Sequence, residues 1–232
     1  MFGTIVNAAA IIAGSLAGLF LRGGIPEKYN NTIMHAVSLA VITIGIKGAV
    51  KTDQLLVVIF SLALGSIAGE VLMIEDRLEG LGRRLEKKFA GDPGGSPFYK
   101  GFITATLLFC VGSMAIVGAL ESGLLNNHQI LFAKSALDGM ISIILSSSFG
   151  LGVMFSALPV FVYQGAITLA AGVVKPFLLP EVITQMSSVG GVLIMAIGFN
   201  LLGVVKIRIG SMLPSVFLPL VWYMVLVGVD FF

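Results

Sequence analysis

A lysine and an aspartate stand four residues apart in one of the most apolar parts of the sequence, at Lys134 and Asp138. Residues at this spacing share a helix face, and Ser142 and Ser146 continue that face at two further steps of four. Ionisable side chains are costly inside a bilayer, and they typically mark ion or solute paths. We interpret these four residues as the start of a polar face that serves such a path.

A second interpretation of the same residues is purely structural. Ser135 could be the N-cap of a helix whose third residue is Asp138, where a carboxylate stabilises the positive helix end. The two interpretations are compatible, because a polar face that begins at a capped helix end is also an entrance. The sequence leaves both open.

The segment that follows is rich in hydroxyls and glycines. Its three consecutive serines are Ser146, Ser147 and Ser148. If the helix ends near Gly150 and Gly152, freed carbonyls and these serines would line a polar site, since irregular backbone at depth must face protein or a cavity. The alternative is a tight cytoplasmic hairpin, with Pro159 in the first turn of the next helix.

Four other polar residues are candidates for the same site: Glu121, Gln164, Asn200 and Lys47. Glu121 lies either at the outer interface or, if Gly112 and Gly118 weaken its helix, beside a cavity. The Gln164 amide needs a partner wherever it is buried. Asn200 and Lys47 occupy matching positions in two similar segments, although an amide is also common as a link between helices.

The amino-acid composition indicates whether the protein folds in water or in a lipid bilayer. The chain has 232 residues, 57% hydrophobic and 11% charged, and its mean hydropathy is +1.03. Such a sequence is typical of a polytopic membrane protein, and its small net charge of +2, largely scattered, argues against nucleic-acid binding. The N-terminus reads as a first span and not as a cleaved signal. The lone Cys110 permits no disulfide framework, and we expect it to be inert.

Apolar segments of roughly 17–22 residues recur, each long enough to cross a ~30 Å hydrocarbon core. We predict spans at 3–22, 32–50, 54–73, 101–120, 135–154, 158–176, 186–205 and 210–229. The fold class is therefore all-α, with about eight spans in a single membrane domain, 1–232. Within it we divide the chain into a first repeat (1–73), a polar segment (74–100), central spans (101–157) and a second repeat (158–232).

The polar segment 74–100 predicts an amphipathic helix followed by a break. Its apolar face would hold Leu78, Leu81 and Leu85, and its basic surface Arg77, Arg83, Arg84, Lys87 and Lys88. Basic residues accumulate on the cytoplasmic side, so we place this segment there and both termini outside. Four basic residues agree with this orientation, Arg22, Lys28, Lys206 and Arg208, whereas four count against it, Lys47, Lys51, Lys134 and Lys175.

Two stretches of the chain resemble each other, 16–47 and 170–200. The matches are Gly18 with Gly172, Pro26 and Glu27 with Pro180 and Glu181, and, after one gap, Ile44 and Gly45 with Ile197 and Gly198. In the predicted topology their first spans cross in opposite directions. The sequence therefore predicts an inverted repeat about an axis in the membrane plane.

Three stretches also resemble a known family: "GSLAGLFLRGGIPE", "KSALDG" and "FGLGVMFSALPVFVYQGAITLAAG". They are similar to the YqgA/YdfK-like bacterial membrane proteins, a family catalogued as domain of unknown function 554, over almost the whole chain. The resemblance implies a multi-pass protein of the bacterial inner membrane, sometimes described as a transporter. It supplies no catalytic or binding residues.

Two identical small-residue spacings, "GSLAG" and "GSIAG", allow helices to cross closely, either within the fold or across a homodimer. Their glycines are Gly14, Gly18, Gly65 and Gly69. No metal-spaced cluster, nucleotide loop or nucleophile with its base is recognisable, so we expect no metal, no cofactor and no enzyme activity. The leading hypothesis is a transporter or permeation protein for a small polar solute or ion. The alternative is a non-transporting scaffold or regulator that acts through the amphipathic helix.

Overall fold

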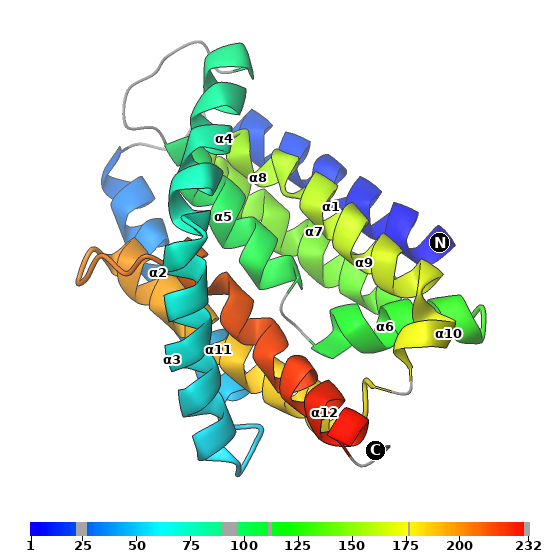
Figure 1. Cartoon of the computed structure of the whole chain (residues 1–232). Coiled ribbons are helices and arrows are strands. Elements are labelled where there is room, and N and C mark those ends of the chain that lie inside the picture. The colour runs from blue at the N-terminus through cyan, green and yellow to red at the C-terminus, as the bar shows by residue number, and fades with distance from the viewer. Residues whose placement is uncertain (22–26, 90–96, 111–112, 176, 230–232) are drawn as a thin grey trace.

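The computed structural model describes residues 1–21, 27–89, 97–110, 113–175 and 177–229, and every regular element in these ranges is a helix (Figure 1). In chain order the helices are α1 (Phe2–Leu21), α2 (Glu27–Ala49), α3 (Leu55–Val71), α4 (Ile74–Phe89), α5 (Pro97–Cys110), α6 (Ser113–Leu124), α7 (Gln129–Phe149), α8 (Gly152–Phe155), α9 (Ala157–Leu169), α10 (Ala171–Val174), α11 (Pro180–Leu202), the 3₁₀ helix η2 (Gly210–Phe217) and α12 (Leu218–Val229). The predicted all-α class is confirmed.

The described helices fit a membrane in length and composition. Four are long and apolar enough to cross one: Phe2–Leu21, Gln129–Phe149, Gly152–Leu169 and Pro180–Leu202. The number rises to six if two bent pairs each count as one span, α3 with the start of α4 (56°) and α5 with α6 (58°). The count of eight spans stays a prediction.

Large apolar side chains cover much of the outer surface, as helices that face lipid require. Phe20 is 91% exposed, and Leu56, Leu64 and Val173 are exposed as well. In water such a surface would be an association site, whereas in a bilayer it meets a solvent of its own polarity.

The helices form two groups that lie side by side (Figure 1). One group holds α1 and α5–α9, with α1 packed along α7 and touching α9. The other holds α2, α3, α11, η2 and α12, with α2 packed along α11 and α3 along η2. The predicted first repeat, 1–73, thus contributes its first helix to one group and its other two helices to the other.

Glycines set the closest helix crossings. A Cβ atom on Gly14 or Gly18 would clash with backbone carbonyls of α7, at Gly139 and Ile143. A Cβ atom on Gly65 or Gly69 would clash in the same way with η2, at Ser215 and Ser211. The small-residue spacings therefore serve crossings within the chain, one of the two predicted uses, and a homodimer stays a prediction that needs another surface.

The central helices differ from the predicted spans in three places. The span expected at 101–120 is two helices, α5 and α6; the residues between them, 111–112, lie outside the described part. The span expected at 135–154 begins six residues earlier, at Gln129, and the span expected at 158–176 ends at Leu169 before the short α10. The early start of α7 has a physical reason, since Lys134 is buried in an ion pair and so does not have to end the helix at the interface.

α11 illustrates how the sequence sets helix ends. It begins at Pro180, whose fixed φ suits the first helical position and whose missing N–H is not needed there. It ends at Gly203, which adopts a left-handed conformation with φ 74° and donates its N–H to the Asn200 carbonyl. The matching helix of the first repeat, α2, begins at Glu27, the residue that the sequence pairs with Glu181.

Candidate functional site

The candidate site is built around Lys134 and Asp138 in the middle of α7. The ammonium group donates to Asp138 Oδ2, and the two residues are only 4% and 5% exposed. Ionised groups at this burial are tolerated when they are paired and hydrogen-bonded. The predicted shared face of the two residues is confirmed, and it points into the protein.

Two amides from other helices complete the site. Asn7 of α1 donates its Nδ2 to Asp138 Oδ2 at 3.1 Å and to Gln164 Oε1 of α9 at 3.3 Å. Both amide residues are fully buried. We call Asn7, Lys134, Asp138 and Gln164 the polar cluster; it joins α1, α7 and α9 at one point.

The surroundings of the polar cluster are close and apolar. Gly14 and Gly18 bring the α1 backbone onto that of α7, which holds Asn7 within reach of Asp138. On the α5 side, the Lys134 ammonium lies 5.7 Å from the centroid of the Phe109 ring, within the range of a cation–π interaction. Because the surroundings are apolar, a polar group at this point finds most of its hydrogen-bond partners within the cluster itself.

The polar cluster keeps hydrogen-bonding capacity that the described residues do not use. Asn7 Oδ1, an acceptor, and Gln164 Nε2, a donor, are buried without a hydrogen-bond partner in this part of the chain. Hydroxyls on the same three helices share this state: Thr4, Ser142 and Thr168. Unpaired buried hydroxyls also occur elsewhere, at Thr106, Ser187, Ser188 and Ser211, so the hydroxyls alone do not single out this region. What does single it out is an unused amide donor beside an unused amide acceptor, because buried polar atoms are nearly always satisfied in folded proteins.

The helix-capping interpretation of Asp138 is wrong. α7 begins at Gln129, with His128 before it, so Asp138 lies in the helix interior and not in the first turn. Ser135 is not a cap either, because its hydroxyl donates to the Leu131 carbonyl one turn earlier. The sequence suggested a cap because a serine followed three residues later by an acid is the pattern of a capped helix start.

The predicted serines divide between two roles. Ser142 and Ser146 are fully buried on the face of Asp138, as predicted. Ser146 donates to the Gly150 carbonyl at the end of α7, and Ser147 donates to the Ile144 carbonyl. Ser148 is partly buried, and its hydroxyl has no hydrogen-bond partner among the described residues. α7 ends at Gly150, which has a positive φ of 73°, and the chain turns there into α8 and then α9. Both alternatives include this turn, so the choice between them stays a prediction.

Three predicted residues have partners or surroundings elsewhere. Glu121, near the end of α6, accepts a hydrogen bond of 2.9 Å from Asn127 in the loop that follows, and its place at the outer interface stays a prediction. Asn200 makes two hydrogen bonds of 2.8 Å to the backbone of Ile207 and so closes the loop after α11. Lys47 is exposed near the end of α2.

Sequence reasoning missed Asn7, which links all three helices. A signal was present, because Asn7 carries the only amide in α1, an otherwise apolar helix. A lone amide in a span usually seeks a partner on a neighbouring helix. Which neighbour it would find depends on helix packing, which the sequence did not predict.

A second polar region lies where α3 bends into α4. Arg208 pairs with Glu70 at 2.5 Å and with Asp76 at 2.9 Å, while Glu75 accepts hydrogen bonds from Tyr99 and from the Gly210 backbone. We call Arg208, Glu70, Glu75 and Asp76 the junction network. It brings the loop after α11 to the start of α4, so these two segments, both assigned to the cytoplasm by the sequence, share one end of the bundle.

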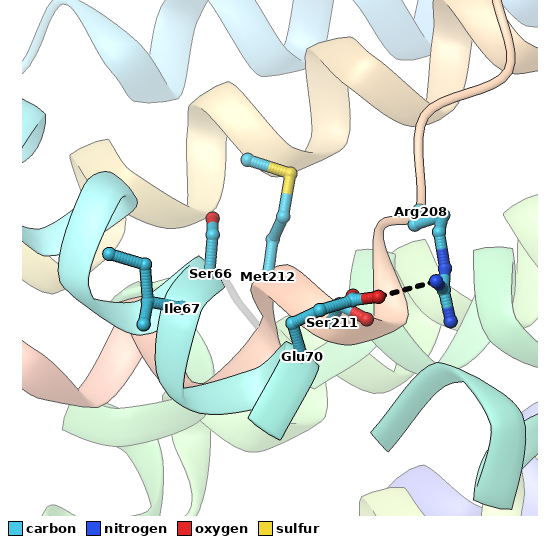
Figure 2. Close-up of a pocket in the computed structure, with 6 residues that line it drawn as sticks. All are labelled: Ser66, Ile67, Glu70, Arg208, Ser211 and Met212. Atoms are coloured by element: carbon cyan, nitrogen blue, oxygen red, sulfur yellow. Dashed lines mark hydrogen bonds and ion pairs between the residues drawn. The ribbon is translucent and has the colours of Figure 1, made fainter. Parts of the chain in front are cut away.

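An open pocket of about 360 Å³ adjoins the junction network, lined by Ser66, Ile67, Glu70, Arg208, Ser211 and Met212. Figure 2 shows the Arg208–Glu70 ion pair on one side of the pocket and Ile67 on the other. About half of each charged side chain is exposed, 46% for Arg208 and 52% for Glu70. Water therefore solvates these charges, unlike those of the polar cluster.

The described residues contain no group of three or more His, Cys, Asp or Glu that could hold a metal ion. The polar cluster itself offers one carboxylate, one ammonium and two amides, which is a set for binding a polar solute by charge and hydrogen bonds.

Comparisons with known proteins give a consistent result. A family model described as protein of unknown function (DUF554) matches residues 2–224. The chain is 35% identical over 223 residues to the "uncharacterized membrane protein YdfK" of Bacillus subtilis (strain 168), covering 94% of each chain. It is 28% identical over 227 residues to the "uncharacterized protein YqgA" of Escherichia coli (strain K12), covering 95% of each. No solved structure matches.

Proposed function

The chain belongs to the family described as protein of unknown function DUF554, and within it we propose that the protein is a carrier or permeation protein for a small polar solute or ion. One observation carries the proposal. A buried ion pair, Lys134–Asp138, is hydrogen-bonded to amides that keep an unused donor and an unused acceptor. Within membrane helices such groups are expensive, and they typically face a substrate or ion path.

An inverted repeat is part of this proposal, and helix packing supports it. Gly45 of α2 lies against Gly191 and Met195 of α11, while Gly198 of α11 lies against Ser38 and Ile42 of α2. The shift that aligns Gly45 with Gly198 also aligns Ser38 with Gly191 and Ile42 with Met195. The two sets of contacts therefore exchange under the repeat, as a two-fold axis between α2 and α11 requires.

The same relation favours a site between the repeats. Under the sequence alignment α1 corresponds to α9, because Gly18 near the end of α1 matches Gly172 just beyond α9. The Asn7–Gln164 hydrogen bond joins these two helices. In carriers with inverted repeats, binding sites lie where the repeats meet near the bilayer midplane. Asp138, at the middle of α7, would stand at that depth.

The membrane arrangement that we propose follows the sequence. The protein would be a multi-pass protein of the bacterial inner membrane with about eight spans, its basic segment 74–100 cytoplasmic and its termini outside. The relative from Bacillus subtilis bears the name of a membrane protein, which supports the location. Reporter fusions at Lys88 and at the C-terminus test the orientation, and a cytoplasmic C-terminus would contradict it.

Water access to the polar cluster tests the proposed function without knowledge of the solute. In a Cys110→Ser background, we would replace Ser142 by cysteine and treat membrane vesicles with a membrane-impermeant thiol reagent. A carrier exposes this position to water in at least one state, so Ser142→Cys should be labelled. Gln129→Cys, at the exposed start of α7, is the positive control, and Leu145→Cys, buried and apolar on the same helix, is the negative control.

If Ser142→Cys and Asn7→Cys both stay unlabelled from either side of the membrane while Gln129→Cys reacts, no aqueous path reaches the cluster. The carrier proposal would then be wrong.

A second candidate function is a scaffold or regulator that works through α4. The observation that favours it is the 56° bend at the end of α3, which turns the basic sequence of α4 away from the line of the preceding span. A surface of this kind binds anionic lipid or an acidic partner. The same labelling experiment separates the candidates, because a scaffold has no need for water beside Ser142.

A further inference from the structure

The charges and the unused amide atoms of the polar cluster restrict the solutes that can bind there. Lys134 and Asp138 neutralise each other inside an apolar helix bundle. A lone cation bound to Asp138 would compete with Lys134, and a lone anion bound to Lys134 would compete with Asp138. In either case one protein charge would lose its partner, which is strongly unfavourable at this burial.

A solute that carries both charges avoids this loss. Its anionic group can pair with Lys134 while its cationic group pairs with Asp138, so both protein charges exchange one partner for another. The total charge of the site is zero before and after binding. A buried ion pair can separate only if each of its charges gains a new partner, and such a solute meets this requirement.

The unused amide atoms fit the same solute. Gln164 Nε2 is a donor, like the Lys134 ammonium, and Asn7 Oδ1 is an acceptor, like the Asp138 carboxylate. Hydrogen bonds link the four groups in the order Lys134, Asp138, Asn7, Gln164. We infer that one acceptor-rich solute group binds Lys134 and Gln164, and that one donor-rich group binds Asp138 and Asn7. A carboxylate and a primary ammonium are the groups that meet these two demands.

We propose that the polar cluster binds a small zwitterion of the amino-acid class, with its carboxylate on Lys134 and Gln164 and its ammonium on Asp138 and Asn7. The proposal rests on the proposed transport function and specifies its substrate class.

Binding of L-alanine to the full-length protein in detergent, measured by calorimetry, tests the substrate class. Matched solutes remove one feature at a time: propionate lacks the ammonium, ethylamine lacks the carboxylate, and propionamide lacks both charges. We expect L-alanine, glycine or L-serine to bind, and each matched solute to bind weaker by roughly a hundredfold or more, because a buried partner is left unpaired.

Two variants assign the binding to the cluster. Lys134→Met combined with Asp138→Leu removes the ion pair as a unit, and replacing a buried pair by apolar side chains generally preserves stability. We expect this variant to unfold at or above the parent temperature and to bind no zwitterion. Arg208→Gln, in the junction network, should bind like the parent.

A charge-exchanged variant, Lys134→Asp with Asp138→Lys, covers the case in which the apolar pair does not fold. It keeps an ion pair at the same spacing but sets each charge beside the wrong amide, so binding should still be lost.

Three results would overturn the zwitterion proposal. They are binding of propionate or ethylamine as tight as that of L-alanine, zwitterion binding that survives in the apolar variant, and no zwitterion binding at all. None of these three results contradicts the transport proposal if the impermeant thiol reagent labels Ser142→Cys. An unlabelled Ser142→Cys defeats the transport proposal itself.

Discussion

The polar cluster and the junction network both contain ion pairs, but in opposite surroundings. In the cluster, one ion pair is 4–5% exposed and joins three helices through two amides. In the network, Arg208 pairs with two carboxylates whose side chains are 52% and 58% exposed. Attraction between charges is screened by water in the second region and little screened in the first. Function is therefore better indicated by the free energy that it costs to bury an ion pair than by the number of ion pairs.

The largest predicted effect breaks the buried pair on one side only. Asp138→Ala leaves Lys134 without its partner among apolar side chains, and we expect a loss of about 3–5 kcal/mol in unfolding free energy. Denaturant unfolding in detergent micelles measures this value. Asp138→Asn keeps the shape and a hydrogen bond to Asn7 but removes the charge, so it separates the charge from the packing. A loss below about 1 kcal/mol for Asp138→Ala would mean that Lys134 reaches water.

The next effect concerns the crossing that holds the polar cluster together. Gly14→Leu forces a side chain into the backbone of α7, and overpacking of this kind costs about 1–3 kcal/mol or more. Gly69→Leu makes the same change beside the junction network, against Ser211. We expect both to lower the unfolding temperature, but only Gly14→Leu to abolish binding at the cluster. Gly172→Ala, with open space around it, is the control and should change little.

A smaller effect is expected where Asn200 closes the loop that carries Arg208. Asn200→Ala removes both hydrogen bonds to Ile207, and we expect a loss of about 1–2 kcal/mol. Hydrogen exchange of the loop amides should rise in this variant. An unchanged exchange rate at Ile207 would show that the loop is held by other contacts.

The smallest effect is expected in the junction network itself. Arg208→Gln removes two half-exposed ion pairs, and exposed pairs contribute about 0–1 kcal/mol each. The difference from the parent should shrink further in high salt, because screening already weakens these pairs. A loss as large as that of Asp138→Ala would remove the distinction between the two regions.

The sequence predicted the polar face of α7 but not its surroundings. Helical periodicity places Lys134, Asp138 and Ser142 on one face whatever the tertiary structure, so this prediction needed no packing information. The start of α7 was misplaced because hydropathy treats a charged residue as an end, whereas an internal ion pair lets the helix continue. The role of Asn7 depends on a contact across 131 residues of chain, which no local pattern records.

In the junction network, too, some features could be predicted from the sequence and others could not. Basic residues predicted correctly that Arg208 and the start of α4 share one end of the bundle, because charges collect outside the hydrocarbon core. The two hydrogen bonds of Asn200 could not be predicted, since an amide that binds a loop backbone is indistinguishable in sequence from one that faces a neighbouring helix.

The spacing of Lys134 and Asp138 also bears on biogenesis. Because both charges belong to one helix, the pair can form as soon as α7 coils, before α1 or α9 is beside it. Each unpaired charge at the centre of an inserting helix costs about 2.5–3.5 kcal/mol at the translocon. A helix that neutralises its own charges enters the bilayer more easily than one that waits for a counterion from a later span. The nascent chain can thus deliver α7 to the membrane before the polar cluster is assembled.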